Sequence, residues 1–453
     1  MREKMFFRMV LIAWAATMLA ACTSESENGP SANISYESIA ATQQVPVTFG
    51  TYMGEQANTR SGHAGSIDLA QLKAAGFGVL AYHTDNGNFD GTASTGSQPN
   101  FMYNQEVTWA TSAWTYSPLK YWPNSIGDFT NTGATTTATT TGVDRLSFFA
   151  YAPYVEVKTS GTPLGNVTDT TRPDKGITHI TANNVGGNPS VTYVFDDDPA
   201  YSVDLMYGVA AQNTDYGIGT TATGTITAGN PFIDMTKMTT GTNIKFEFKH
   251  ALARVGLLIQ GAFDSTTAGD GSSPDPTETK ITVASVVING SNMYSQGDLN
   301  LNGGTWSNTT GMASLTLNSK INPVIKDDTP ASLFDPGSTV TGVTTSLIPL
   351  VTGSGSTPDY YMFIPSTTGG TNTTIDSIVI TYYVTTKDDN LSGGYSRVQN
   401  IITQTFTTPV PIQKGLQYLF KLNVGMTSVK IEGAVNEWGA DTDEVLWMPI
   451  NSD

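Results

Sequence analysis

The most regular feature of the chain is a series of short apolar runs, each closed by Gly, Asn, Asp or Pro. In several of them, such as 244–248 (IKFEF) and 429–435 (VKIEGAV), apolar and polar residues alternate, which is typical of strands with one buried and one solvent-exposed face. A single helical turn is predicted, at 66–75 (SIDLAQLKAA), with Ser66 as its cap. The pattern predicts strands at 45–52, 76–82, 145–154, 190–195, 202–208, 244–248, 253–261, 280–290, 360–365, 377–386, 417–424 and 429–435.

Segments rich in Thr, Gly or Asp and without periodicity separate these runs, and they predict loops. They lie at 131–141, 220–229 and 264–279. One aromatic-rich block precedes the segment 230–241 and another follows it. The sequence therefore predicts an all-β chain of two β-sandwich domains in series, at 44–235 and 236–453.

The first 22 residues have the pattern of an export signal. A basic start is followed by the apolar stretch 9–20 (MVLIAWAATMLA), which is too short to span a bilayer and indicates a secretory signal peptide over residues 1–21. The run closes on Leu-Ala-Ala-Cys, with Cys22 as the only cysteine of the chain. These residues resemble the lipobox of bacterial lipoproteins; the alternative is a plain signal peptide with a chance cysteine.

The lipobox resemblance implies a diacylglyceryl thioether on Cys22, cleavage before it, and acylation of the new amine by a fatty acid such as palmitate. Several acyl chains anchor a protein firmly, whereas one holds only marginally. The resemblance thus implies an outer-membrane lipid anchor at the cell surface. The polar segment 22–43 predicts a flexible tether.

Charge and cysteine content narrow the function classes. The net charge is −17, and removal of residues 1–22 leaves −19, which disfavours nucleic acid and anionic membrane surfaces as partners. Without a second cysteine the exported part contains no disulfide, so its core alone must hold it. Only 13% of residues are charged, and the remainder is rich in Thr, Ser, Gly, Asn and aromatic residues, a composition that suits strands.

No catalytic motif is found in the sequence. The four histidines form no metal-protease signature, and no nucleophile elbow, phosphate-binding loop or dinucleotide fingerprint occurs. We predict no catalytic residue, no metal and no cofactor. The acidic runs at 196–198 and 264–275 match no calcium-loop spacing and are interpreted as solvated turns. His250 is interpreted as a packed, hydrogen-bonded residue.

An ordered set of motifs resembles the fimbrillin family of Bacteroidales, the type V pilins and related adhesins. The set spans roughly residues 44–440 and includes WTYSPLKYWP (114–123), DRLSFFAYAPY (144–154), VDLMYG (203–208), IKFEFKHALARVGLLI (244–259) and KGLQYLFKLNV (414–424). The resemblance implies two transthyretin-like β-sandwich domains, export as a lipoprotein, and assembly into a pilus with other pilin subunits.

The resemblance also implies how assembly begins. In the family, a maturation protease cuts after an arginine and removes the lipidated segment with the first strand, and a strand from another subunit fills the groove. Here the candidate first strand is 45–52, with Val45, Val47 and Phe49 on one face. Arg60 is the first basic residue after Cys22 and lies in a polar stretch, which makes it the candidate cleavage site; the alternative is an ordinary surface arginine.

The candidate donor strand is the apolar run near the C-terminus, represented by Val445, Trp447 and Ile450. The alternative is that this run folds back as the last strand of its own domain. A donor strand would indicate a stalk subunit, and a folded-back strand a tip or anchor subunit.

A second function class stays open at this point. Trp114, Tyr116, Tyr121 and Trp122 could stack on sugars, which would make the chain a surface-anchored glycan-binding lipoprotein that does not polymerise. We instead expect these aromatics to fill or cover the first core. For this alternative class, and for an adhesin, the candidate partner is a host or bacterial surface glycan or protein.

Overall fold

The computed structural model describes most of the chain from residue 45 onward. Cys22, Arg60, the predicted signal peptide at 1–21 and the tether at 22–43 lie outside the described residues. No helix within the described part is long and apolar enough to cross a bilayer. The described residues are 45–52, 67–85, 87–92, 95–123, 144–158, 160–162, 172–210, 229–235, 243–263, 273–351, 353–354, 357–365, 372–437 and 448–449.

The fold is all-β, which confirms the predicted fold class, and its first sheet has eight strands. Neighbouring strands in it are antiparallel except at one end, where the first strand runs parallel to its partner. The order is β1 (Phe49–Tyr52), β10 (Ile244–His250), β8 (Met206–Ala210), β5 (Leu146–Ala152), β2 (Phe77–His83), β3 (Met102–Ala110) and β4 (Ala113–Thr115), with β9 (Phe232–Met235) paired to β5.

The central strands of this sheet are buried on both faces. Phe148 of β5 faces a core that also contains β1, while its neighbour Phe149 faces a second core shared with β6 (Gly176–Ile180) and β7 (Ser190–Val194). Every residue of β5 is buried. A strand covered on both sides needs apolar residues at successive positions, which explains why LSFFAYA shows no alternation.

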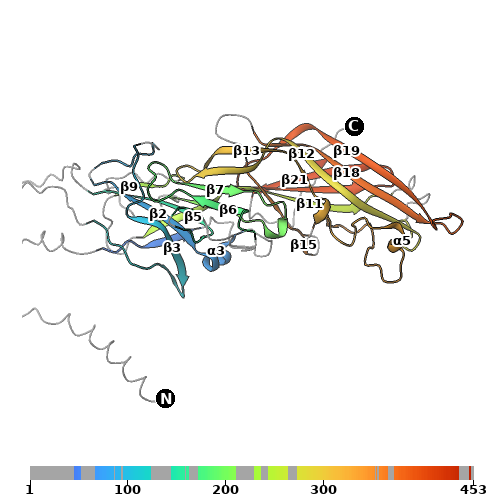
Figure 1. Cartoon of the computed structure of the whole chain (residues 1–453), viewed down its shortest axis with the longest axis horizontal. Coiled ribbons are helices and arrows are strands. Elements are labelled where there is room, and N and C mark those ends of the chain that lie inside the picture. The colour runs from blue at the N-terminus through green and yellow to red at the C-terminus, as the bar shows by residue number, and fades with distance from the viewer. Residues whose placement is uncertain are drawn as a thin grey trace, which may run out of the picture. The chain divides into compact units, whose positions relative to one another are not determined.

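Two further sheets form a sandwich. One contains β14 (Ile348–Pro349), β11 (Ala253–Gly261), β20 (Leu416–Val424), β21 (Val429–Glu437) and β22 (Met448–Pro449), with β17 (Tyr361–Phe363) on β11. The other contains β19 (Tyr395–Pro411), β18 (Thr374–Lys387), β12 (Thr279–Asn300), β7 and β6, with β13 (Thr305–Thr316) on β12. Buried side chains of β11 and β20 pack against those of β12 and β18 in one apolar cluster. Figure 1 shows β12, β18 and β19 side by side.

Strand pairing crosses the boundary predicted at residues 235 and 236. β10 lies after that boundary but pairs with β8 of the first sheet, and β7 lies before it but pairs with β12. Pairing of this kind depends on registers between strands far apart in the chain, which local patterns do not reveal. The division into domains at 44–235 and 236–453 stays a prediction.

The predicted helical turn is present as α3 (Leu69–Ala75), but its cap differs from the prediction. Asp68 is the N-cap: its side chain accepts a hydrogen bond from the Gln71 backbone N–H, and the Gln71 side chain accepts one from the Asp68 backbone N–H. This reciprocal pair is a capping box, in which Asp serves as well as Ser. Short helical turns also occur at α5 (Pro330–Leu333) and at 199–201 and 318–320, and β15 (Gly353–Ser354) pairs with β16 (Thr357–Pro358).

Candidate functional site: the first strand and its surroundings

The segment 45–52 is held by two different neighbours. At its first half, the Val47 N–H donates to the Lys120 carbonyl at 2.9 Å, and the Trp122 N–H donates to the Val45 carbonyl at 2.9 Å. Pro46 opposes Tyr121 in an antiparallel bridge. The second half, β1, pairs instead with β10, in parallel and with Phe49 opposite Ile244. The segment is therefore inserted into the wall of the first core.

Its inward side chains are the three predicted ones. Val45, Val47 and Phe49 are 5%, 0% and 4% exposed, so they share one buried face as period-two alternation requires. All three belong to one apolar cluster with side chains from β2, β5 and β10. Their burial contributes at most roughly 5–9 kcal/mol.

Phe49 lies at the centre of an aromatic group. Its ring centroid is 5.4 Å from that of Tyr116, 6.0 Å from Phe246, 6.1 Å from Phe148 and 6.2 Å from Phe77. These separations are typical of favourable ring contacts. Phe49 is thus the side chain through which the segment engages strands distant from it in the sequence.

Tyr116 fixes the main chain of the segment. Its hydroxyl donates to the Val47 carbonyl at 2.8 Å and accepts from the Lys120 N–H at 3.2 Å. Burial raises the pKa of the Tyr116 phenol to about 12. The neutral phenol, which is the hydrogen-bond donor, is therefore favoured in the fold.

The variant Tyr116→Phe should destabilise the fold by about 1 kcal/mol, because the Val47 carbonyl loses its donor. The pKa is raised, so the contribution of Tyr116 is fully present below about pH 10 and is lost as the pH rises from about 10 to 12. Urea unfolding between pH 7 and 12 measures both effects, with the exposed neighbour Tyr121→Phe as control. A variant as stable as the parent at pH 7 would contradict the role assigned to Tyr116.

The aromatics considered for sugar binding are mostly inside the protein. Trp122 is 3% exposed and packs against Phe148 at 5.7 Å between ring centroids, and Trp114 is 9% exposed. Tyr116 is half-buried, and Tyr121 is exposed. The expectation that these side chains fill or cover the first core is met by Trp114 and Trp122. The buried ring of Trp122 leaves no face on which a sugar could stack.

Ile67, the first described residue after Arg60 in the sequence, is held by a hydrogen bond to a buried carboxylate. The Ile67 N–H donates to Asp204 Oδ2 at 3.0 Å, and Asp204 is fully buried. His250 Nδ1 lies 2.9 Å from the same oxygen, so His250 is a packed, hydrogen-bonded residue as interpreted from the sequence. Arg60 itself lies outside the described residues, between β1 and this anchor at Ile67.

Part of the C-terminal run pairs within the chain. Met448 and Pro449 form β22, which lies antiparallel to β21 with Met448 opposite Gly433. Val445, Trp447 and Ile450 lie outside the described residues. The choice between donor strand and folded-back strand stays open for these three residues.

Of the two acidic runs interpreted as turns, 196–198 is described, whereas residues 264–272 of the other run lie outside the described residues. In the run 196–198, Arg172 Nε donates to Asp196 at 3.0 Å and Lys320 forms an ion pair with Asp198, so cations of the chain neutralise these carboxylates. Sequence reasoning did not bring His83, Asp85 and Asp144 together, because Asp144 is distant in the chain. His83 Nε2 lies 3.6 Å from Asp85 and 3.4 Å from Asp144. Asp85 is exposed, and the ligand atoms of the three side chains lie within 4.8 Å of one another.

Comparisons with known proteins connect this fold to fimbrial proteins. No family model matches the chain. Fimbrium subunit Fim1C of Phocaeicola vulgatus is 23% identical over 380 residues, which cover 82% of this chain and 84% of Fim1C. The crystal structure of a fimbrial protein from Bacteroides vulgatus is 20% identical, covers 87% of this chain and all of that one, and gives a TM-score of 0.53.

The chain thus shares the all-β fold of a fimbrial protein over 87% of its length. The resemblance to the Bacteroidales fimbrillin family, predicted from the ordered motifs, is confirmed by the match to fimbrium subunit Fim1C, and the solved structure shows the shared fold.

Proposed function

We propose that the chain is a structural or adhesive subunit of a cell-surface fimbrium. It is exported as a lipoprotein anchored through Cys22, and it assembles by donor-strand exchange once a protease cuts after Arg60. The fimbrial relatives support the general role, and the fimbrillin resemblance supports the mechanism. Neither relative is named as an enzyme.

One observation carries the mechanism. The segment 45–52 fills the core with three buried side chains while it pairs with residues far along the sequence. A strand of this kind leaves a long apolar groove if it is removed. An extended strand from a second subunit can fill such a groove, because main-chain hydrogen bonds give affinity and alternate side chains give register.

The location of the proposed cut agrees with this mechanism. A cut after Arg60 separates β1 from Ile67, which is tied to the buried Asp204. The segment that leaves is then joined to the domain only by non-covalent contacts, and the remaining domain keeps its anchor.

The experiment that tests the proposal uses a soluble form of the chain that lacks the signal peptide and the lipidated Cys22, residues 23–453. The chain is treated with trypsin, and the product is sized by mass and by electrophoresis in SDS without boiling. We expect a cut after Arg60 followed by an SDS-resistant ladder of oligomers. A product that is cut at Arg60 but stays monomeric would contradict assembly by exchange.

A further inference from the structure

Three side chains that can bind a metal ion meet where the pairing of β2 with β5 ends. His83 is the last residue of β2, and Asp144 lies two residues before β5, its antiparallel neighbour. The Thr84 N–H donates to the Arg145 carbonyl at 3.1 Å, and the Arg145 N–H donates to the Asp85 carbonyl at 2.9 Å. These two bonds continue the pairing past both strand ends and bring Asp85 beside Asp144.

The distances within this group, the His83 cluster (His83, Asp85 and Asp144), are those of ligands around one ion. His83 Nε2 lies 3.4 Å from Asp144 Oδ1 and 3.6 Å from Asp85 Oδ1. Nitrogen and oxygen ligands lie about 2.0–2.2 Å from a tetrahedral Zn²⁺ ion, which places them about 3.3–3.6 Å from one another. The cluster therefore has room for an ion between its ligand atoms.

The imidazole nitrogen that faces the two carboxylates is a buried atom without a hydrogen-bond partner. His83 Nε2 is shielded from solvent, although the ring as a whole is partly exposed, and within the described part of the chain nothing donates to it or accepts from it. A buried polar atom in this condition is costly to the fold. An ion held between Nε2 and the two carboxylates would satisfy all three groups.

The surroundings hold the cluster in place without neutralising it. The His83 N–H donates to Asn100 Oδ1 at 2.7 Å, and Asn100 Nδ2 donates to the His83 carbonyl at 3.0 Å, so the main chain of His83 is fixed on both sides. The cation next to Asp144 in the sequence is Arg145, and its guanidinium donates to Asn88 Oδ1. This differs from the run 196–198, whose carboxylates pair with cations of the chain.

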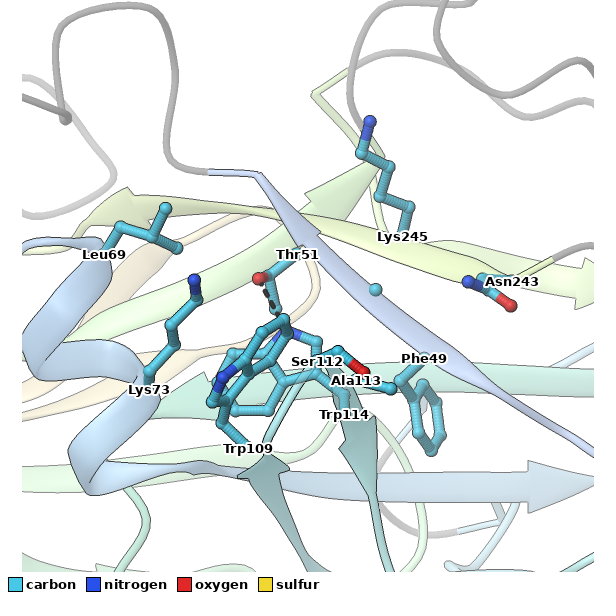
Figure 2. Close-up of a pocket in the computed structure, with 11 residues that line it drawn as sticks. Phe49, Thr51, Leu69, Lys73, Trp109, Ser112, Ala113, Trp114, Asn243 and Lys245 are labelled. Atoms are coloured by element: carbon cyan, nitrogen blue, oxygen red, sulfur yellow. Dashed lines mark hydrogen bonds between the residues drawn. The ribbon is translucent and has the colours of Figure 1, made fainter.

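A hollow elsewhere on the same sheet is unsuited to a cation. The pocket at Gly50 has a volume of about 470 Å³, and Trp109 and Trp114 lie on one side of β1 within it (Figure 2). Its charged lining residues are Lys73 and Lys245, and no carboxylate is among the described residues that line it. Ammonium groups repel a divalent cation. This pocket therefore does not compete with the His83 cluster for a metal.

We propose that the His83 cluster binds a divalent transition metal of the zinc type, with one coordination position open to water. Imidazole and carboxylate groups are usual zinc ligands, whereas Ca²⁺ takes six to eight oxygen ligands. A neutral imidazole and two carboxylates also balance the charge of the ion. The metal would join the end of β2 to the segment that leads into β5. The motifs searched for in the sequence do not detect such a site, because its ligands come from two distant segments.

The test uses residues 23–453 without an affinity tag, freed of metal and titrated with zinc chloride in a calorimeter. We expect one equivalent of zinc to bind and to raise the melting temperature, because the ion binds the folded chain. One equivalent of Co²⁺ should give the visible absorption of a four-coordinate ion. A chain that binds neither metal would overturn the proposal.

Variants of the three ligands locate the site. His83→Ala, Asp144→Asn and Asp85→Asn should each weaken zinc binding at least tenfold, since loss of a second-shell partner alone costs about 10–100-fold. Asp85 is exposed, so Asp85→Asn keeps the fold, and the melting temperatures of the metal-free variants verify the other two. The matched control is His179→Ala, an exposed histidine on β6, which should change zinc affinity less than twofold.

The outcomes bear on this site alone. Equal zinc affinity in the parent and in all three ligand variants would show binding elsewhere on the surface and would overturn the assignment. A zinc-induced rise in melting temperature that persists in His83→Ala would do the same. Neither result touches strand exchange, which requires no metal.

Discussion

The variant Arg60→Ala should remain monomeric under conditions in which the parent chain polymerises. Without a cut, the segment 45–52 stays covalently joined to the domain that contains its groove, and a short covalent connection gives an effective concentration of about 1 mM. A donor strand at about 1 μM then competes at a disadvantage of about a thousandfold, or about 4 kcal/mol, before any difference in contacts. We therefore expect at least a hundredfold loss of SDS-resistant oligomers.

The matched control is Arg60→Lys, which trypsin still cuts. This control should polymerise like the parent after trypsin and stay monomeric with a protease specific for arginine. Equal ladders from Arg60→Ala and from the parent would show that assembly does not depend on this cut.

The variant Phe49→Ala should loosen the first strand more than any other single change within it. Removal of a fully packed Phe costs about 3–5 kcal/mol, and Phe49 touches four aromatic rings from elsewhere in the core. Hydrogen exchange of the amides at 45–52 measures the loss directly. An effect of this size accelerates their exchange by about a hundredfold or more.

Phe49→Ala has an informative control. Val398 of β19 is 59% exposed, and Val398→Ala should change stability by about 0.5 kcal/mol at most. After a cut at Arg60, the Phe49→Ala chain should also release its fragment 23–60 faster than the parent. Unchanged exchange at 45–52 in the variant would contradict the central position given to Phe49.

Strands whose sequences are dense in apolar and β-branched residues could be predicted from the sequence. The run 253–261 coincides with β11, and the run 377–386 lies within β18, because both carry dense β-branched and apolar residues. β19 was not predicted: it spans 17 residues as an edge strand, and most of its side chains are exposed or half-buried. An edge strand with few buried positions has little apolar pattern to detect.

Some features of the candidate site could likewise be predicted from the sequence, and others could not. Alternation identified Val45, Val47 and Phe49 as one buried face, because burial of one face is a local property of a strand. The sequence did not reveal that the segment pairs with residues 120–122 on one side and with β10 on the other. It also gave no sign of the pocket at Gly50, whose walls come from α3, β3, β4 and β10. Such walls are formed by residues that long-range pairing brings together, and a local sequence pattern carries no information about that pairing.

The burial of Trp114 and Trp122 favours a fimbrial subunit over a glycan-binding lipoprotein that does not polymerise. The sequence allowed these rings to form a sugar-binding surface, whereas in the structure they belong to the core that encloses the first strand. The same aromatics that could have indicated a glycan site instead line the groove on which the assembly mechanism depends.

The most direct test of the account is a reconstruction of assembled fibres by electron microscopy at a resolution that identifies side chains. The account predicts that the strand between β10 and residues 120–122 belongs to a neighbouring subunit, and that each subunit begins after Arg60. Fibres in which Val45, Val47 and Phe49 of the same chain still occupy that groove would contradict it.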